Sequence, residues 1–220
     1  MISSVFKALG DLFAPEFRGV LLKAVGLTLA LFVGLFILVQ ILLTSLTQLP
    51  WPWAETMAAV GVGLGMLVAF FFLMSPVTAI FAGIFLDEIA AKVEKRHYPN
   101  DPPGTPLPAI TAILTGARFA LIVLLVLLAV LPTVFFGIGA IAMVGANAYL
   151  LSREYFEMAA MRHMPVDEAR GFRKANAPQV FVAGLIPAVL SVVPLANLLV
   201  PLFATSYFVH LFKEARASSV

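Results

Sequence analysis

Charged residues are absent from four long stretches of this chain, which are residues 24–54, 56–86, 119–152 and 175–212. The 220 residues include only 14 basic and 12 acidic side chains, and all of these lie in the short segments between and around the stretches. A hydrocarbon core about 30 Å thick is crossed by about 20 apolar helical residues. A soluble domain of this length cannot bury so much uninterrupted apolar sequence. The sequence therefore predicts an all-α integral membrane protein, with residues 1–220 forming a single membrane domain.

The first two stretches predict a transmembrane hairpin over residues 19–86. Residues 21–47 and 56–86 are each long enough to cross a bilayer with some tilt. In the connection, Pro50 and Pro52 break the helix, and the neighbouring tryptophans suit the headgroup interface. Two long transmembrane helices are expected here.

The last two stretches have lengths that fit a single span poorly. A straight helix over residues 119–151 would be about 50 Å long, whereas each leg of a folded helix would reach only about 22–25 Å. Pro132 lies near the middle of the third stretch, and Pro187, Pro194 and Pro201 interrupt the fourth. Proline removes a backbone donor and clashes with the preceding turn, so bends are expected there. We expect proline-bent helical hairpins over residues 119–151 and 180–212, which are either hemi-penetrating or cross fully in a locally thinned bilayer.

Basic residues favour hairpins that return to the side they entered over two single spans. The four groups are Lys7, Arg18 and Lys23; Lys92, Lys95, Arg96 and Arg118; Arg153, Arg162, Arg170, Arg173 and Lys174; and Lys213 and Arg216. If the last two stretches were single spans, the third group would lie outside the cell. If each hairpin returns to the side that it entered, every basic residue is cytoplasmic, as the positive-inside rule favours. Both termini and residues 87–118, 152–179 and 213–220 are then cytoplasmic.

Two further segments have clear patterns. The apolar residues of 1–14 share one helical face, so an interfacial amphipathic helix is expected within residues 1–18. Residues 99–108 contain five prolines and predict an extended loop.

Few residues suggest catalysis or metal binding. The absence of cysteine excludes disulfides and thiolate metal sites. His97, His163 and His210 are scattered, so neither a metal site nor a cofactor is expected, and no nucleophile–base pair indicates an enzyme. A net charge of +2 gives no indication of a nucleic-acid partner.

An anion path is the more promising interpretation. The apolar stretches contain no acidic residue, which favours a channel-like or facilitated route over a proton pump. Arg118, Arg153 and Asn197 could line such a route, although boundary arginines are more often interface anchors. Arg18 is the best single candidate, because Pro15 suits the first position of a helix, whose positive end binds anions. Its alternative role is to reach lipid phosphate.

Several segments resemble the CysZ-type sulfate transporters of the etoposide-induced-protein family. They are Ser75-Pro76 with residues 84–94, residues 147–155, and residues 193–197 with Pro201 and Thr205. The resemblance covers nearly the whole chain. It implies a multi-pass protein of the bacterial inner membrane that forms homo-oligomers and admits sulfate for cysteine biosynthesis. It also implies the architecture expected above, with membrane lipids and sulfate or a related oxyanion as partners.

The family's anion motif reads glycine-leucine-arginine, usually with a second arginine. Here it becomes Glu16-Phe17-Arg18-Gly19, so one arginine is kept and Gly19 replaces the second. Glu16 would oppose a dianion unless Arg18 neutralises it. The candidate substrate-binding residues are Arg18, Phe17, Gly19, Arg118, Arg153 and Asn197. The expected function is uptake of sulfate or a similar oxyanion, and the alternative is a non-transporting membrane scaffold or assembly factor.

Overall fold

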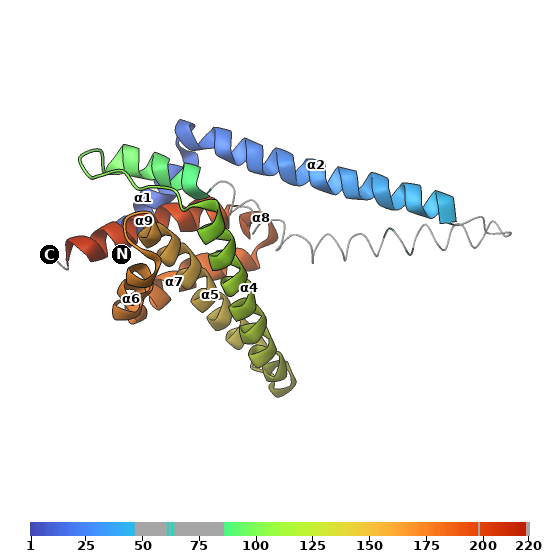
Figure 1. Cartoon of the computed structure of the whole chain (residues 1–220). Helices are drawn as coiled ribbons and strands as arrows, with labels where there is room; N and C mark the ends of the chain where they lie inside the picture. The colour runs from blue at the N-terminus through green and yellow to red at the C-terminus, as the bar shows by residue number, and fades with distance from the viewer. Residues whose placement is uncertain (47–60, 62, 64–85, 198, 219–220) are drawn as a thin grey trace. The chain divides into compact units, whose positions relative to one another are not determined.

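The computed structural model describes residues 1–46, 61, 63, 86–197 and 199–218 of the chain. These residues form helices, turns and loops, and none of them lies in a β-strand (Figure 1). The chain divides into two compact units, one made of Met1–Arg18 and Leu86–Val220 and the other of Gly19–Phe85. The predicted turn at residues 48–55 and nearly all of the second long helix lie outside the described residues.

The N-terminal segment is two helices, α1 over Ile2–Phe13 and α2 over Pro15–Leu46. Between them, Ala14 is extended, with φ −72° and ψ 141°. A residue before proline is disfavoured in the α conformation, whereas proline itself suits the first position of a helix. The amphipathic helix expected within residues 1–18 therefore ends at Phe13, and residues 15–18 already belong to α2.

Helix α1 presents its small and polar face to the rest of the first unit. Ser4, Ala8 and Asp11 are buried, and α1 packs on α9, which spans Val200–Ala217. Phe6 and Phe13 are exposed, at 69% and 75%. The apolar face of this amphipathic helix is thus left uncovered within the described residues.

A second hairpin follows the proline-rich loop. Residues 86–97 are helical, and residues 98–108 contain no helix, as the prolines predicted. Helix α4 (Ala109–Val130) and helix α5 (Gly139–Met161) then lie side by side, joined by the 3₁₀ turn η1 (Leu131–Phe136) (Figure 1). Pro132 lies in η1, and Gly137 next to it has φ 72°, a conformation that favours glycine. The chain therefore reverses direction close to Pro132.

The C-terminal region contains α6 (Val166–Ala175), α7 (Ala177–Val192), the short α8 (Pro194–Asn197) and α9. The expected interruption of the helix at Pro187 is wrong, whereas Pro201 lies just after a turn at Leu199. Helix α7 continues through Pro187, and Pro201 lies in the first turn of α9, where the missing N–H costs nothing. Between α7 and α9, the chain leaves the helical conformation at Val193, immediately before Pro194, and at Leu199.

Helix α9 forms the core of the first unit. Its fully buried aromatic residues include Phe203, Tyr207, Phe208 and Phe212. Phe212 packs edge-on against Phe156 of α5, with ring centroids 6.1 Å apart. Burying a phenylalanine side chain contributes about 1.5–3 kcal/mol, so α9 holds α1, α5 and α7 around it.

Length and hydropathy give limited support for membrane crossing. Within the described residues, no single helix is both long enough and apolar enough to cross a bilayer. The pair α6 and α7, which meet at a bend of 90°, would meet these criteria together.

Gly184 allows α5 and α7 to approach closely, and its substitution by alanine should destabilise the fold. A Cβ atom at Gly184 would overlap the carbonyl oxygen of Ala148 and lie 2.6 Å from Cβ of Ser152. Overpacking of this kind costs about 1–3 kcal/mol, which exceeds the gain of up to about 1 kcal/mol in helix propensity. Thermal unfolding in detergent, followed by circular dichroism, should show a lower midpoint for Gly184→Ala.

Gly171→Ala is the matched control. Gly171 lies inside α6, and no atom lies within 4 Å of the position that its Cβ would occupy, so alanine there should be neutral or stabilising. A Gly184→Ala midpoint at or above that of the wild type would contradict the close packing of α5 on α7.

Candidate functional site

The start of α2 carries the residues of the predicted anion motif. Phe17 is fully buried and its N–H donates to the carbonyl of Ala14 at 3.1 Å, which anchors the first turn. Arg18 and Gly19 are both exposed. Within the described part of the chain, the Arg18 guanidinium has no ion-pair partner. A positive charge therefore remains available beside the N-terminus of a long helix.

Glu16 is neutralised by Arg96, a residue distant from it in the sequence. The Arg96 Nη1 atom lies 2.9 Å from Oε2 of Glu16, and Lys92 Nζ donates to the Glu16 carbonyl at 3.0 Å. Neutralisation of Glu16 does not depend on Arg18, because the helix of residues 86–97 supplies the counter-charge. Glu16 is therefore no longer a free negative charge opposing an anion at Arg18.

The other predicted site residues are dispersed. Arg118 is exposed on α4, whereas Arg153 of α5 pairs with Glu157, with 3.6 Å between Nε and Oε1. Asn197 ends α8 and is half-buried. Among the residues that the structure describes, no side-chain hydrogen bond or ion pair joins any two of the six predicted site residues.

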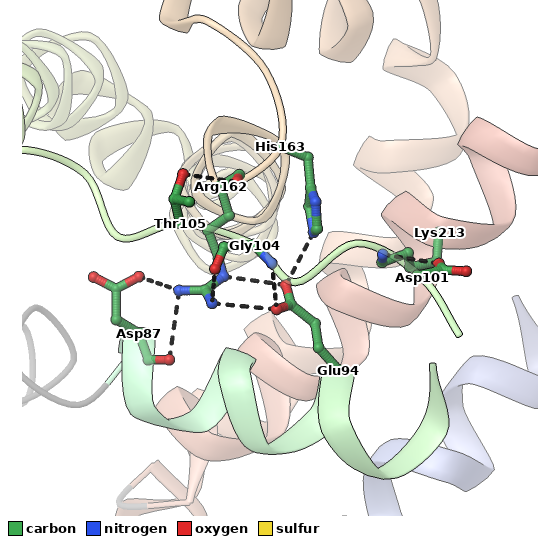
Figure 2. A network of polar contacts seen from close by, with 8 residues as sticks. All are labelled: Asp87, Glu94, Asp101, Gly104, Thr105, Arg162, His163 and Lys213. Carbon is green, nitrogen blue, oxygen red and sulfur yellow. Dashed lines mark hydrogen bonds and ion pairs between the residues drawn. The ribbon is translucent and has the colours of Figure 1, made fainter. Parts of the chain in front are cut away.

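A buried network around Arg162 joins three segments that the sequence did not connect (Figure 2). Arg162, at the end of α5, donates through Nε and Nη2 to the two carboxylate oxygens of Glu94, at 3.1 and 3.2 Å. It also pairs with Asp87, and its carbonyl accepts the N–H of Thr105 at 2.9 Å. The side chains of Arg162 and Glu94 are only 4% and 7% exposed.

Glu94 receives two more donors. Nε2 of His163 lies 3.0 Å from Oε1 of Glu94, and the N–H of Gly104 donates to Oε2 at 3.1 Å. Burial alone would raise the pKa of Glu94, but hydrogen bonds from His163 and Arg162 and the positive charge of Arg162 lower it to about 2. Because these contacts occupy the carboxylate on both oxygens, the network fastens the proline-rich loop to α5 and leaves Glu94 no vacant position for a ligand.

A second cluster surrounds Asp11 of α1. Its Oδ1 lies 2.8 Å from Nε2 of His97, and its Oδ2 accepts from Ser206 Oγ at 2.5 Å and lies 3.4 Å from Nε2 of His210. Burial would raise the pKa of Asp11, but hydrogen bonds to His210, Ser206 and His97 lower it below its usual value. The interpretation of the histidines as scattered is wrong for His97 and His210, which meet in space although no sequence spacing relates them.

Comparison with known proteins identifies the family. The family profile described as "Sulfate transporter CysZ/Etoposide-induced protein 2.4" matches residues 4–201 of the 220. The chain belongs to this family. The CysZ/etoposide-induced family is described by a transport activity and not as a family of enzymes. No curated protein matches the chain.

The Glu94 network predicts a specific pH dependence of stability. Because the pKa in the folded protein is about 2, below the ordinary value of 4.5, the stabilisation is complete above pH 4.5 and is lost as the pH falls towards 2. Glu94→Gln leaves Arg162 buried with Asp87 as its remaining ion-pair partner, and should lower the free energy of unfolding by about 3 kcal/mol at neutral pH. Chemical denaturation from pH 7 to pH 2.5 should show the wild type and the variant converging.

Asp167→Asn is the control for this series. Asp167 is 96% exposed and pairs only at the surface with Arg170, so its loss should change stability by less than about 1 kcal/mol at every pH. A constant difference between Glu94→Gln and the wild type across the series would contradict the assigned network.

Proposed function

We propose that this protein is a channel-like or facilitated transporter of sulfate or a similar oxyanion across the bacterial inner membrane, supplying sulfur for cysteine biosynthesis. The observation that carries this proposal is the match of residues 4–201 to a family described as a sulfate transporter. The sequence supports a passive route, since the charge-free stretches contain no acid that could relay protons.

The apolar surface of the first unit supports membrane insertion. Leu121, Leu125 and Leu128 on α4 are more than half exposed, and Phe136 and Ile141 at the α4–α5 turn are 77% and 79% exposed. Contiguous apolar surface of this kind marks a lipid or protein contact. Helix α2 carries a similar surface within the second unit, where Phe36, Ile37 and Leu38 are also exposed.

The lengths of the helices support hemi-penetration. From Phe119, after the last charge of α4, to Val130, the apolar part of this helix is about 18 Å long, well short of a core about 30 Å thick. The return helix meets charge again at Arg153, beyond the middle of α5. A hairpin that ends at membrane depth needs protein or water around its turn. We therefore include a homo-oligomer in the proposal, because neighbouring subunits could surround the turns.

The start of α2 supports an initial capture site. A helix N-terminus attracts anions, and a guanidinium can bind an oxyanion through two parallel hydrogen bonds. Phe17 fixes the first turn, Arg18 supplies the charge, and Gly19 leaves open space, because no atom lies within 4 Å of a Cβ position there. Arg118, Arg153 and Asn197 are proposed to contact the anion further along its route.

Sulfate flux into proteoliposomes tests the capture role. Arg18→Ala removes a charge-assisted contact worth about 1.5–3 kcal/mol, so the sulfate concentration for half-maximal flux should rise about 10-fold or more. The half-maximal sulfate concentration of Arg18→Lys should lie between those of the wild type and Arg18→Ala, since lysine keeps the charge but loses the two parallel hydrogen bonds. Lys174→Ala, which removes one exposed positive charge on α6, should behave as the wild type.

Two outcomes would count against the proposal. Unchanged flux in Arg18→Ala removes the capture role, and wild-type protein that passes no sulfate removes transport and favours the scaffold or assembly factor. Sulfite, thiosulfate and chloride, measured beside sulfate, define the range of anions.

The proposed topology places all basic segments in the cytoplasm, which labelling can test directly. The chain has no cysteine, so single cysteines at Lys95 and Lys174, both exposed, give unambiguous signals. A membrane-impermeant thiol reagent should reach both in inside-out vesicles and neither in intact cells. Labelling of Lys174→Cys, but not of Lys95→Cys, in intact cells would contradict the returning hairpin.

A further inference from the structure

The first unit contains a cluster of potential metal ligands, formed by Asp11, His97 and His210. They come from α1, the helix of residues 86–97 and α9, and their ligating atoms all lie within 4.8 Å of one another. Asp11 and His210 are buried, whereas the side chain of His97 is 21% exposed. The cluster is therefore largely withdrawn from solvent and still has one side open to entry.

The chemistry of these three ligands favours particular metal ions. Two imidazole nitrogens and one carboxylate form the set that holds Zn²⁺ with a fourth position left for water. Imidazole favours zinc and neighbouring transition metals, whereas calcium and magnesium require oxygen ligands almost exclusively. We propose that Asp11, His97 and His210 bind a divalent transition-metal ion of the zinc type.

The present separations are close to those that an ion would impose. Ligands about 2.0–2.1 Å from a tetrahedral ion lie about 3.3 Å from one another. Oδ1 of Asp11 lies 2.8 Å from Nε2 of His97, and Oδ2 lies 3.4 Å from Nε2 of His210. Taking one ligating atom from each residue, the three atoms lie within 4.8 Å of one another. Small side-chain rotations would therefore suffice to close the site, and the Asp11–His97 hydrogen bond holds the two ligands together without an ion.

Neighbouring groups fix the orientation of two of the ligands. The Tyr98 hydroxyl lies 2.8 Å from Nδ1 of His210, which turns the other ring nitrogen towards Asp11. Ser206 donates to Asp11 and holds its carboxylate in place. Hydrogen bonds of this kind to the outer side of the ligands are typical of protein metal sites.

Two positive charges would oppose a cation: that of Lys7, which acts electrostatically on His210, and that of Arg96, whose Nε lies 3.8 Å from Oδ1 of Asp11. The Arg96 side chain is 40% exposed and already pairs with Glu16 through Nη1. Arg96 can therefore turn towards Glu16 when an ion enters. The bound ion would fasten α1 to α9 and to the helix of residues 86–97, whether or not the chain carries sulfate.

Titration with Zn²⁺ alone tests the site on the purified full chain in detergent, after removal of metals with a chelator. Isothermal titration calorimetry should show one equivalent of Zn²⁺ bound. Thermal unfolding should show a midpoint that Zn²⁺ raises and that the chelator restores. His97→Gln keeps a polar side chain at the more exposed ligand and should weaken binding at least about 100-fold. His163→Gln, which alters the third histidine beside Glu94, is the matched control and should bind as the wild type.

The absence of Zn²⁺ binding by the folded wild type would overturn the proposal, as would unchanged affinity in His97→Gln. Should His97→Gln fail to fold, Co²⁺ binding to the wild type decides the question. Intense visible absorption bands of four-coordinate Co²⁺ support the site, and the weak spectrum of hydrated Co²⁺ at saturating metal overturns it.

Discussion

The buried pair of Arg162 and Glu94 is the contact on which the order of the first unit depends. A guanidinium with two hydrogen bonds to one carboxylate fixes direction as well as distance, which apolar packing alone does not. Removing either charge would leave the other buried with too few partners, at a cost of several kcal/mol. The pair therefore sets the position of the helix of residues 86–97 and of the proline-rich loop against α5 (Figure 2). That same helix then presents Arg96 to Glu16 and His97 to Asp11.

Charge and apolar surface are sorted to different places in this unit. Polar contacts gather around the helix of residues 86–97, the end of α5, and α1, whereas the turn between α4 and α5 exposes phenylalanine and isoleucine. The core between them is the aromatic face of α9. A water-soluble protein would have to leave the apolar turn exposed, whereas the proposed hairpin would place that turn in lipid. This sorting is consistent with the proposed topology, in which the basic groups lie on one side of the membrane.

Local features of the fold could be predicted from the sequence, and contacts between distant segments could not. The helix start at Pro15, the reversal near Pro132 and the extended loop at residues 98–108 follow from what proline and glycine do to the backbone. Pro187 shows the limit of this reasoning, because α7 continues through it although one helical hydrogen bond must be missing there. Pro201 has no such bond to lose, because it lies in the first turn of α9. Arg162 with Glu94, and Asp11 with His97 and His210, were missed because their spacing in the chain has no period. Only the packing of α1, α5, α9 and the helix of residues 86–97 brings them together.

The pairing of Glu16 with Arg96 changes how the altered anion motif should be interpreted. By sequence alone, an acid in place of the motif's glycine weakens an oxyanion site, since a carboxylate repels a dianion. In the structure this carboxylate already has a cationic partner, and Lys92 binds the Glu16 carbonyl beside it. Glu16 is therefore paired, and Arg18 is left exposed to solvent with its own positive charge. An arginine held 80 residues away in sequence thus compensates for the acid without restoring the missing second arginine. On this argument the site should attract anions in general, and preference for sulfate has to come from the paired hydrogen bonds of Arg18 rather than from charge alone.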